Sequence, residues 1–158
     1  MKYKQFLVHC SSYIVLCSLF ILLMSCELET SDNGNLDGMW QLYAADTLRT
    51  PDGTPGGSAD MRQSGKVWAF QGRIMMLRQS DGFHHMEVIC KFEHEGQWLR
   101  VYDPHFSNRE IDDPRIDDPE TLFPYGLHAL DNRLQVQTLS KDWLVVQTDE
   151  LRLKFRKY

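Results

Sequence analysis

Aspartates and histidines are the side chains in this chain whose types and spacing could support metal chemistry. One short pattern occurs twice, as Ile111-Asp112-Asp113-Pro114 and Ile116-Asp117-Asp118-Pro119, and its carboxylates could offer several oxygens to calcium. The Asp-x-Asp-x-Asp-Gly order of known calcium loops is absent, and no glycine supplies the sharp turn. We therefore expect a solvated acidic loop here and no metal site.

The histidines also fail to form a recognisable site. His84 and His85 are neighbours, so on a strand their side chains would point to opposite faces and could not bind one zinc ion together. His94, His105 and His128 stand singly near expected turns. No order of Ser, His and Asp indicates a nucleophile with its base. The sequence therefore predicts a non-enzymatic protein without a cofactor.

The first 26 residues carry a different chemistry. Lys2 and Lys4 precede an apolar run over residues 13–24, which has the length of a signal peptide and is short for a membrane span. The sequence Leu23-Met24-Ser25-Cys26 resembles the lipobox of bacterial lipoproteins, which implies diacylation of the Cys26 thiol and cleavage just before it. We expect a signal peptide over residues 1–25, a lipidated cysteine with a flexible tether over residues 26–35, and one domain over residues 36–158.

This organisation places the domain outside the cytoplasm. Acyl chains would hold it in the cell envelope of a Gram-negative bacterium, and we expect the outer membrane. Glu27, Glu29 and Asp32 follow Cys26 and loosely resemble the acidic stretch of lipoproteins that are sent to the cell surface. Attachment facing the periplasm and attachment facing the exterior both stay open.

Charge and cysteine content narrow the class of protein further. Removal of residues 1–25 deletes Lys2 and Lys4 and no acidic residue, which changes the formal net charge from −5 to −7. This charge argues against nucleic acid and against anionic membrane surfaces as partners. Cys90 is left as the one cysteine beyond Cys26, so no disulfide forms within the domain, and its apolar surroundings predict a core residue.

Short alternating segments separated by turns dominate the chain from residue 36 onward. The expected strands are residues 39–45, 67–70, 74–78, 86–93, 97–102, 133–139, 143–147 and 151–158. About eight strands without a convincing amphipathic helix predict an all-β, antiparallel up-and-down meander. Closure into a small barrel removes its exposed edges, and a two-sheet β-sandwich is the alternative.

Three segments carry a resemblance to a known family. The opening Gly38-Met39-Trp40 looks like the Gly-x-Trp start of lipocalin-like barrels, and residues 67–72 and 151–158 resemble lipocalin-like lipoproteins of Gram-negative bacteria. The resemblance covers residues 36–158, although the Thr-Asp-Tyr motif and the disulfide common in lipocalins are absent. It implies that Trp40 packs across the barrel floor under a cation from the last strand, for which Arg152, Arg156 and Lys154 are the candidates.

The resemblance implies an architecture able to bind a small apolar or amphipathic molecule. Residues on the second to fifth expected strands are the candidates for the lining of such a pocket: Val67, Trp68, Ala69, Phe70, Met76, Met86 and Trp98. Small Val67 and Ala69 would leave room for a ligand if they point inward. The Gly- and Pro-rich residues 49–65 would be a lid over the mouth or a simple connector.

The alternative function is a non-enzymatic interaction module of the cell envelope. Residues 103–124 would then contact a protein partner through an acidic surface with an apolar anchor beside it. The residues predicted for that surface are Asp112, Asp113, Asp117, Asp118, Phe123 and Tyr125.

Overall fold

The computed structural model describes residues 31–50, 52–54, 56–80 and 85–158. Cys26, the expected signal peptide and His84 lie outside the described residues, and so does the side chain of Met86. The strands are β1 (Gly38–Thr47), β2 (Ser58–Asp60), β3 (Lys66–Gln71), β4 (Ile74–Ser80), β5 (His85–Glu95), β6 (Trp98–Phe106), β7 (Asp131–Leu139), β8 (Trp143–Gln147) and β9 (Leu151–Lys157). The 3-10 helices are η1 (Gly34–Leu36), η2 (Arg109–Ile111) and η3 (Pro119–Tyr125).

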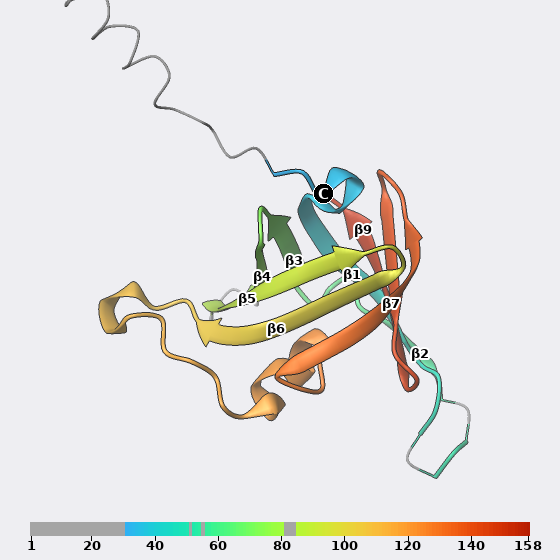
Figure 1. The fold of residues 1–158 in the computed structure, drawn as a ribbon. Helices are drawn as coiled ribbons and strands as arrows, with labels where there is room; N and C mark the ends of the chain where they lie inside the picture. Colours follow the sequence, from blue (N-terminus) through green and yellow to red (C-terminus); the bar gives the residue numbers. More distant parts are fainter. Residues whose placement is uncertain (1–30, 51, 55, 81–84) are drawn as a thin grey trace, which may run out of the picture. The chain divides into compact units, whose positions relative to one another are not determined.

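Each strand from β3 to β8 pairs antiparallel with the next one along the chain, and β1 pairs with both β3 and β9. The pairing of β1 with β9 closes the sheet, so the predicted barrel of eight antiparallel strands is confirmed (Figure 1). The sandwich alternative is excluded because one continuous ladder joins all the strands. β2 is an additional strand that the sequence pattern did not indicate.

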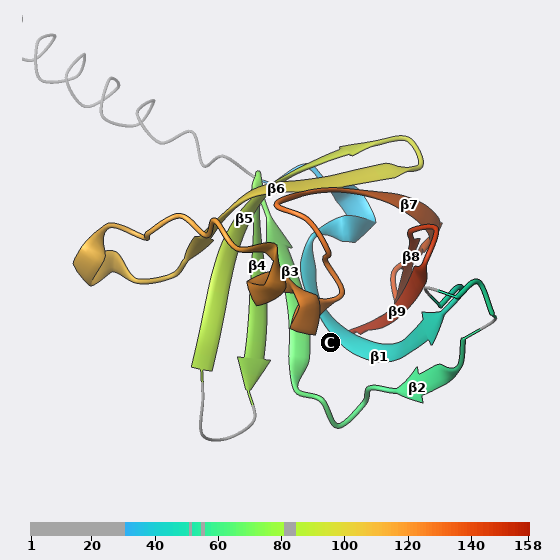
Figure 2. The same ribbon diagram turned by 90° about the horizontal axis from the view of Figure 1, so that it is seen from below.

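The segment expected as a lid or connector contributes β2. Residues 58–60 pair with residues 44–46 of β1, and the strand lies beside β1 on the outside of the ring (Figure 2). This part of the segment therefore extends the sheet at the edge of β1. Within the described residues, no helix is long and apolar enough to cross a membrane.

The two ends of the barrel are built from different parts of the chain. One end, called the floor here, holds η1, the β3–β4 and β7–β8 turns and the C-terminus (Figure 1). The opposite end, called the mouth, holds the segment from residue 107 to residue 130 with η2 and η3. Because β6 continues to Phe106, this segment begins later than the residue 103 expected from the sequence.

Alternation along the strands sends one set of side chains inward, as the period of a β-strand requires. The inward side chains of all eight barrel strands merge into a single core cluster, in which Trp40, Met75, Leu77, Leu99 and Phe155 have no exposed surface. The interior is therefore a packed apolar core. Asn132 is the one polar side chain among the buried residues of the described part.

Phe155→Ala should lower the free energy of unfolding by about 3–5 kcal/mol, because it removes a fully buried ring from the centre of this core. The Phe155 ring lies 4.4 Å from the Trp68 ring, centroid to centroid, so a cavity would open beside Trp68. Urea denaturation followed by tryptophan fluorescence measures the loss.

The exposed neighbour Arg156 provides the control on the same strand. Arg156→Ala should change the free energy of unfolding by less than about 0.5 kcal/mol. Equal losses for the two variants would contradict the assignment of Phe155 to the interior.

Candidate functional site

The interior of the barrel is lined by aromatic rings in contact with one another. Trp68 packs against Phe155 and Phe70, and the Phe70 ring meets the Phe92 ring edge to face with 5.0 Å between centroids. These rings come from β3, β5 and β9, which the closed sheet brings around one axis. Such a lining suits contact with an apolar molecule, since it offers no buried charge.

The structure separates the second expected strand into an inner and an outer face. Trp68 and Phe70 belong to the core cluster, whereas Val67 and Ala69 point to the outer face. Val67 instead borders an open hollow of about 390 Å³ on the outside of the barrel, together with Met39. The expectation that Val67 and Ala69 leave room inside is therefore wrong, because the large rings occupy the inner face.

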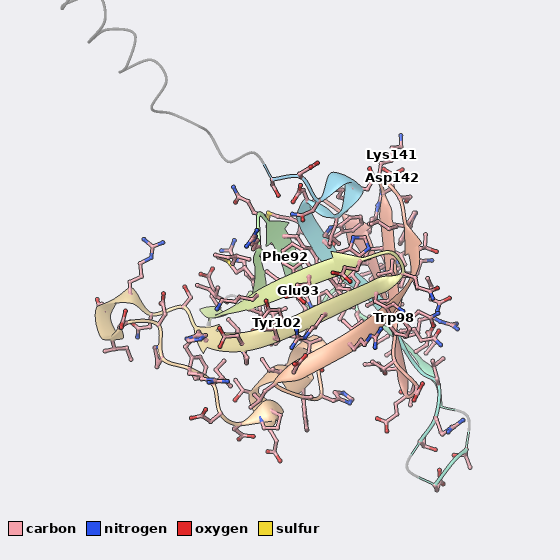
Figure 3. All side chains as sticks on the ribbon, viewed as in Figure 1. Phe92, Glu93, Trp98, Tyr102, Lys141 and Asp142 are labelled. Carbon is pink, nitrogen blue, oxygen red and sulfur yellow. The ribbon has the colours of Figure 1, made fainter. Side chains whose placement is uncertain are left out.

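Two other residues of the predicted lining also lie outside the interior. Met76 pairs with Ala69 and shares its outer face, because the neighbouring inward positions of β4 are Met75 and Leu77. Trp98 lies on the outer surface of β6, where the Arg133 guanidinium sits 4.3 Å from its ring centroid (Figure 3). Of the described side chains predicted to line the pocket, Trp68 and Phe70 are the two in the core cluster.

The floor of the barrel is closed by Trp40 and a lysine above its ring. Lys157 Nζ lies 4.8 Å from the Trp40 ring centroid and donates a hydrogen bond of 2.8 Å to the Asn35 carbonyl. The two residues are direct partners in the β1–β9 ladder. The predicted tryptophan floor is thus present, but its cation is Lys157.

Parity along β9 explains why Arg152 and Arg156 are not the floor cation. Leu153 and Phe155 are buried and share the inward face with Lys157, whereas Arg152 and Arg156 are exposed on the outer face. Lys154 also points outward and lies 4.4 Å from the Trp143 ring centroid. From residue 151 onward every second residue faces inward. Extending this alternation from Phe155 by two residues would have indicated Lys157.

The chain entering the barrel completes the floor. Leu36 of η1 has no exposed surface, and its carbonyl accepts a 2.8 Å hydrogen bond from Trp40 Nε1. Gly38 has φ of +110°, and a Cβ there would lie 3.1 Å from the Lys157 side chain. A glycine is therefore required at the point where the chain passes beneath the lysine.

The mouth is closed by a segment that is not part of the sheet. η3 and the residues around it place four apolar side chains in the core cluster: Ile116, Leu122, Tyr125 and Leu127. Seen from below, this segment crosses the opening of the ring of strands (Figure 2). Burial, with a smaller effect of Glu87, raises the pKa of the Tyr125 hydroxyl to about 12. We call residues 116–127 the mouth segment.

Burial of Tyr125 corrects the predicted partner surface, because a ring without exposed surface cannot anchor a partner. Phe123, in contrast, is 47% exposed. Of the acidic residues, Asp118 accepts a hydrogen bond from the Glu120 N–H and Asp113 accepts one from the Asn108 N–H. Asp112 and Asp117 are exposed. These contacts give Asp113 and Asp118 a local role in shaping the loop.

Metal ligands are not assembled in the described part of the chain, where no three His, Cys, Asp or Glu side chains form a group able to hold an ion. The Cys90 thiol lies in the core cluster, and burial raises its pKa to about 12. A thiol in this state is a poor nucleophile. Cys90 therefore serves as a packing residue.

A profile of the lipocalin-like domain matches residues 21–158. The chain belongs to this lipocalin-like family. Proteins with such barrels typically fill the interior with side chains or enclose one small ligand there, and they are generally binding proteins.

Two solved structures share the fold of this lipocalin-like protein. A lipocalin-like protein from Bacteroides uniformis ATCC 8492 has a TM-score of 0.55 and 20% identity, covering 79% of this chain and 100% of that chain. An uncharacterized protein from Bacteroides eggerthii DSM 20697 has a TM-score of 0.55 and 14% identity, covering 78% of this chain and 99% of its own. No curated protein matches the chain. At these identities the likeness concerns the fold.

Lys157→Met should lower the free energy of unfolding by about 1–2 kcal/mol. The substitution keeps an apolar stem of similar length but removes the cation over Trp40 and the hydrogen bond to Asn35. Chemical denaturation measures the loss. Arg156→Met, on the outer face of the same strand, is the matched control and should have little effect; a larger loss for Arg156→Met would contradict the assignment of the floor cation.

Proposed function

We propose that this lipocalin-like protein binds a small apolar or amphipathic molecule inside its barrel, entering at the mouth. The observation that carries the proposal is the construction of the mouth. Leu122, Tyr125 and Leu127 occupy the end of an apolar interior, yet they come from a segment outside the sheet. A ligand can replace these side chains without breaking any strand pairing of the barrel.

The mouth segment is attached in a way that permits displacement. Arg115, the residue just before the segment, forms an isolated β-bridge with His105. Gly126, with φ of +79°, ends η3 and lies against Leu153. The Ile116 N–H donates a 2.9 Å hydrogen bond to the Pro104 carbonyl, and four apolar side chains of the segment lie in the core cluster. The contacts that a ligand makes with Trp68, Phe70 and Phe155 would offset those that Leu122, Tyr125 and Leu127 give up.

We further propose that Cys26 is diacylated and anchors the protein in the cell envelope of a Gram-negative bacterium, at the outer membrane. The support is the sequence of residues 1–26, with its basic start, apolar run and Leu23-Met24-Ser25-Cys26. The non-enzymatic character belongs to the same proposal, because the described side chains of the interior offer apolar surface.

A second candidate function is contact with an envelope protein through residues 103–124. The observation that favours it is the exposure of Ile111 and Phe123, at 63% and 47%, within the acidic loop. Asp112 and Asp117 are exposed beside them. Tyr125 does not belong to this surface because it is buried in the mouth.

Ligand binding is tested by native mass spectrometry of residues 27–158 after incubation with palmitate, a sterol and haem. We expect an added mass that disappears on denaturation. Gly126→Ala should raise the apparent affinity about fivefold or more, because it increases the fraction of open protein. The new methyl group would lie 2.6 Å from Leu153 Cδ1. It would displace the mouth segment from the core without creating a cavity.

Phe123→Ala is the control within the mouth segment. Phe123 is exposed, so its truncation should leave the packing of Leu122, Tyr125 and Leu127 in the core unchanged. If neither the natural protein nor Gly126→Ala gains mass after incubation with the probes, the ligand proposal is contradicted. That result would favour the interaction module, in which the barrel is a rigid support for its loops.

The anchor is tested with the full chain expressed in a Gram-negative host supplied with radioactive palmitate. We expect label in the protein and in the outer-membrane fraction, and loss of both in Cys26→Ala, which removes the acylated thiol. Cys90→Ala is the control, because Cys90 is buried in the core. Label that persists in Cys26→Ala would contradict the assignment.

A further inference from the structure

Exposed large apolar side chains gather at two places in the described part of the chain. Ile111 and Phe123 belong to the acidic loop at the mouth. Met39, Ile74 and Tyr158 are 40%, 51% and 76% exposed and belong to the floor end by their positions in the strands. Met39 and Tyr158 also border the hollow on the outer wall that Arg78 and Glu87 line. The three floor residues come from the start of β1, the start of β4 and the C-terminus, so the closed barrel brings together residues that are far apart in the chain.

The floor end also has an open hollow of about 510 Å³ beside these residues. It is lined by Lys141, Asp142, Trp143, Arg156, Lys157 and Tyr158. Lys141 and Asp142 form the turn at the same end of the barrel as the C-terminus (Figures 1 and 3). The Tyr158 N–H donates a 3.0 Å hydrogen bond to the Met39 carbonyl, which fixes the last residue beside the first strand.

Charge is distributed unevenly between the two ends. Arg73, Lys141 and Arg156 are exposed at the floor together with the acidic Asp32, Glu95 and Asp142, so the exposed charges there balance. The loop at the mouth carries two basic residues, Arg109 and Arg115, and a larger number of acidic ones: Glu110, Asp112, Asp113, Asp117, Asp118 and Glu120. The net negative charge is therefore concentrated at the mouth. A negatively charged surface would repel the mouth more strongly than the floor.

The tether brings the same end close to the proposed anchor. The Ser31 hydroxyl oxygen accepts a 2.7 Å hydrogen bond from the Gly72 N–H, which attaches the start of the described chain to the β3–β4 turn. Cys26 lies five residues earlier in the sequence. Five residues span at most about 17 Å, so an acylated Cys26 would hold the floor within that distance of the bilayer surface.

We infer that the floor surface docks on a phospholipid bilayer. This inference rests on the proposed lipid anchor. Ile74, Met39 and Tyr158 enter the boundary between headgroups and acyl chains, while Lys141 and Arg156 meet the phosphates. The mouth then points away from the bilayer, and a ligand reaches it from the aqueous side.

The experiment supplies the anchor chemically. Residues 31–158 form a compact unit, so residues 26–158 can be produced alone. The Cys26 thiol is coupled to a maleimide phospholipid in vesicles of phosphatidylethanolamine and phosphatidylglycerol; Cys90, buried in the core, does not compete. Hydrogen exchange by mass spectrometry then compares coupled protein with free protein.

We expect exchange in residues 71–74 and 140–142 to slow about threefold or more on the vesicles, whereas residues 148–150 at the mouth stay unchanged. Ile74→Glu with Tyr158→Glu should abolish the slowing, because it places two carboxylates in the apolar contact. Ile111→Glu with Phe123→Glu adds the same charge to exposed residues at the mouth and should leave the slowing intact.

Absence of slowing, or equal loss in both double variants, would overturn the inference. Because the coupling replaces biological acylation, these outcomes do not depend on the palmitate experiment, and a failure of that experiment is recognised separately.

Discussion

The pairing of β1 with β9 is the constraint on which the rest of this barrel depends. It removes both edges of the eight-stranded sheet and fixes which side chains of the first and last strands meet. The register places Lys157 opposite Trp40, and it brings Phe155 against Trp68 across the interior. The same register puts the start of the barrel and the C-terminus at one end, because β9 returns antiparallel to β1.

The two ends of the barrel are closed by different kinds of interaction. At the floor, hydrogen bonds join η1 to the strands through Trp40 Nε1 and Lys157 Nζ. At the mouth, the side chains of Leu122, Tyr125 and Leu127 rest in the core and little β-pairing holds their backbone. Local opening requires less free energy where few backbone pairings hold a segment to the fold, so we propose the mouth as the end at which the interior exchanges contents.

This asymmetry connects the proposed ligand with the proposed anchor. The tether leaves from the rigid floor, whose attachment through Ser31 and Gly72 belongs to the same network that supports η1. The displaceable segment lies at the far end, together with the acidic loop. A lipid-anchored protein arranged in this way can open its barrel without disturbing its attachment, because the two processes use opposite ends of the strands.

The sequence by itself determined the strands, the all-β meander and the family, since alternation with period two and the Gly38-Met39-Trp40 opening are local features. It also indicated Trp40 as a floor residue and Cys90 as core. It left undecided which face of β3 points inward, because both Trp68 with Phe70 and Val67 with Ala69 satisfy the alternation. β2 was not indicated, since residues 58–60 have no apolar pattern and form a strand by pairing with β1.

Only the tertiary structure decided how distant residues combine. Alternation along β9 excludes Arg152 and Arg156, but that Lys157 lies opposite Trp40 depends on the register between β1 and β9, which no local pattern contains. The burial of Tyr125 depends on how the loop after β6 folds back over the mouth. The sequence determines which faces are apolar, because that is a property of neighbours along the chain. Closure decides which faces meet, because it joins residues that the chain keeps far apart.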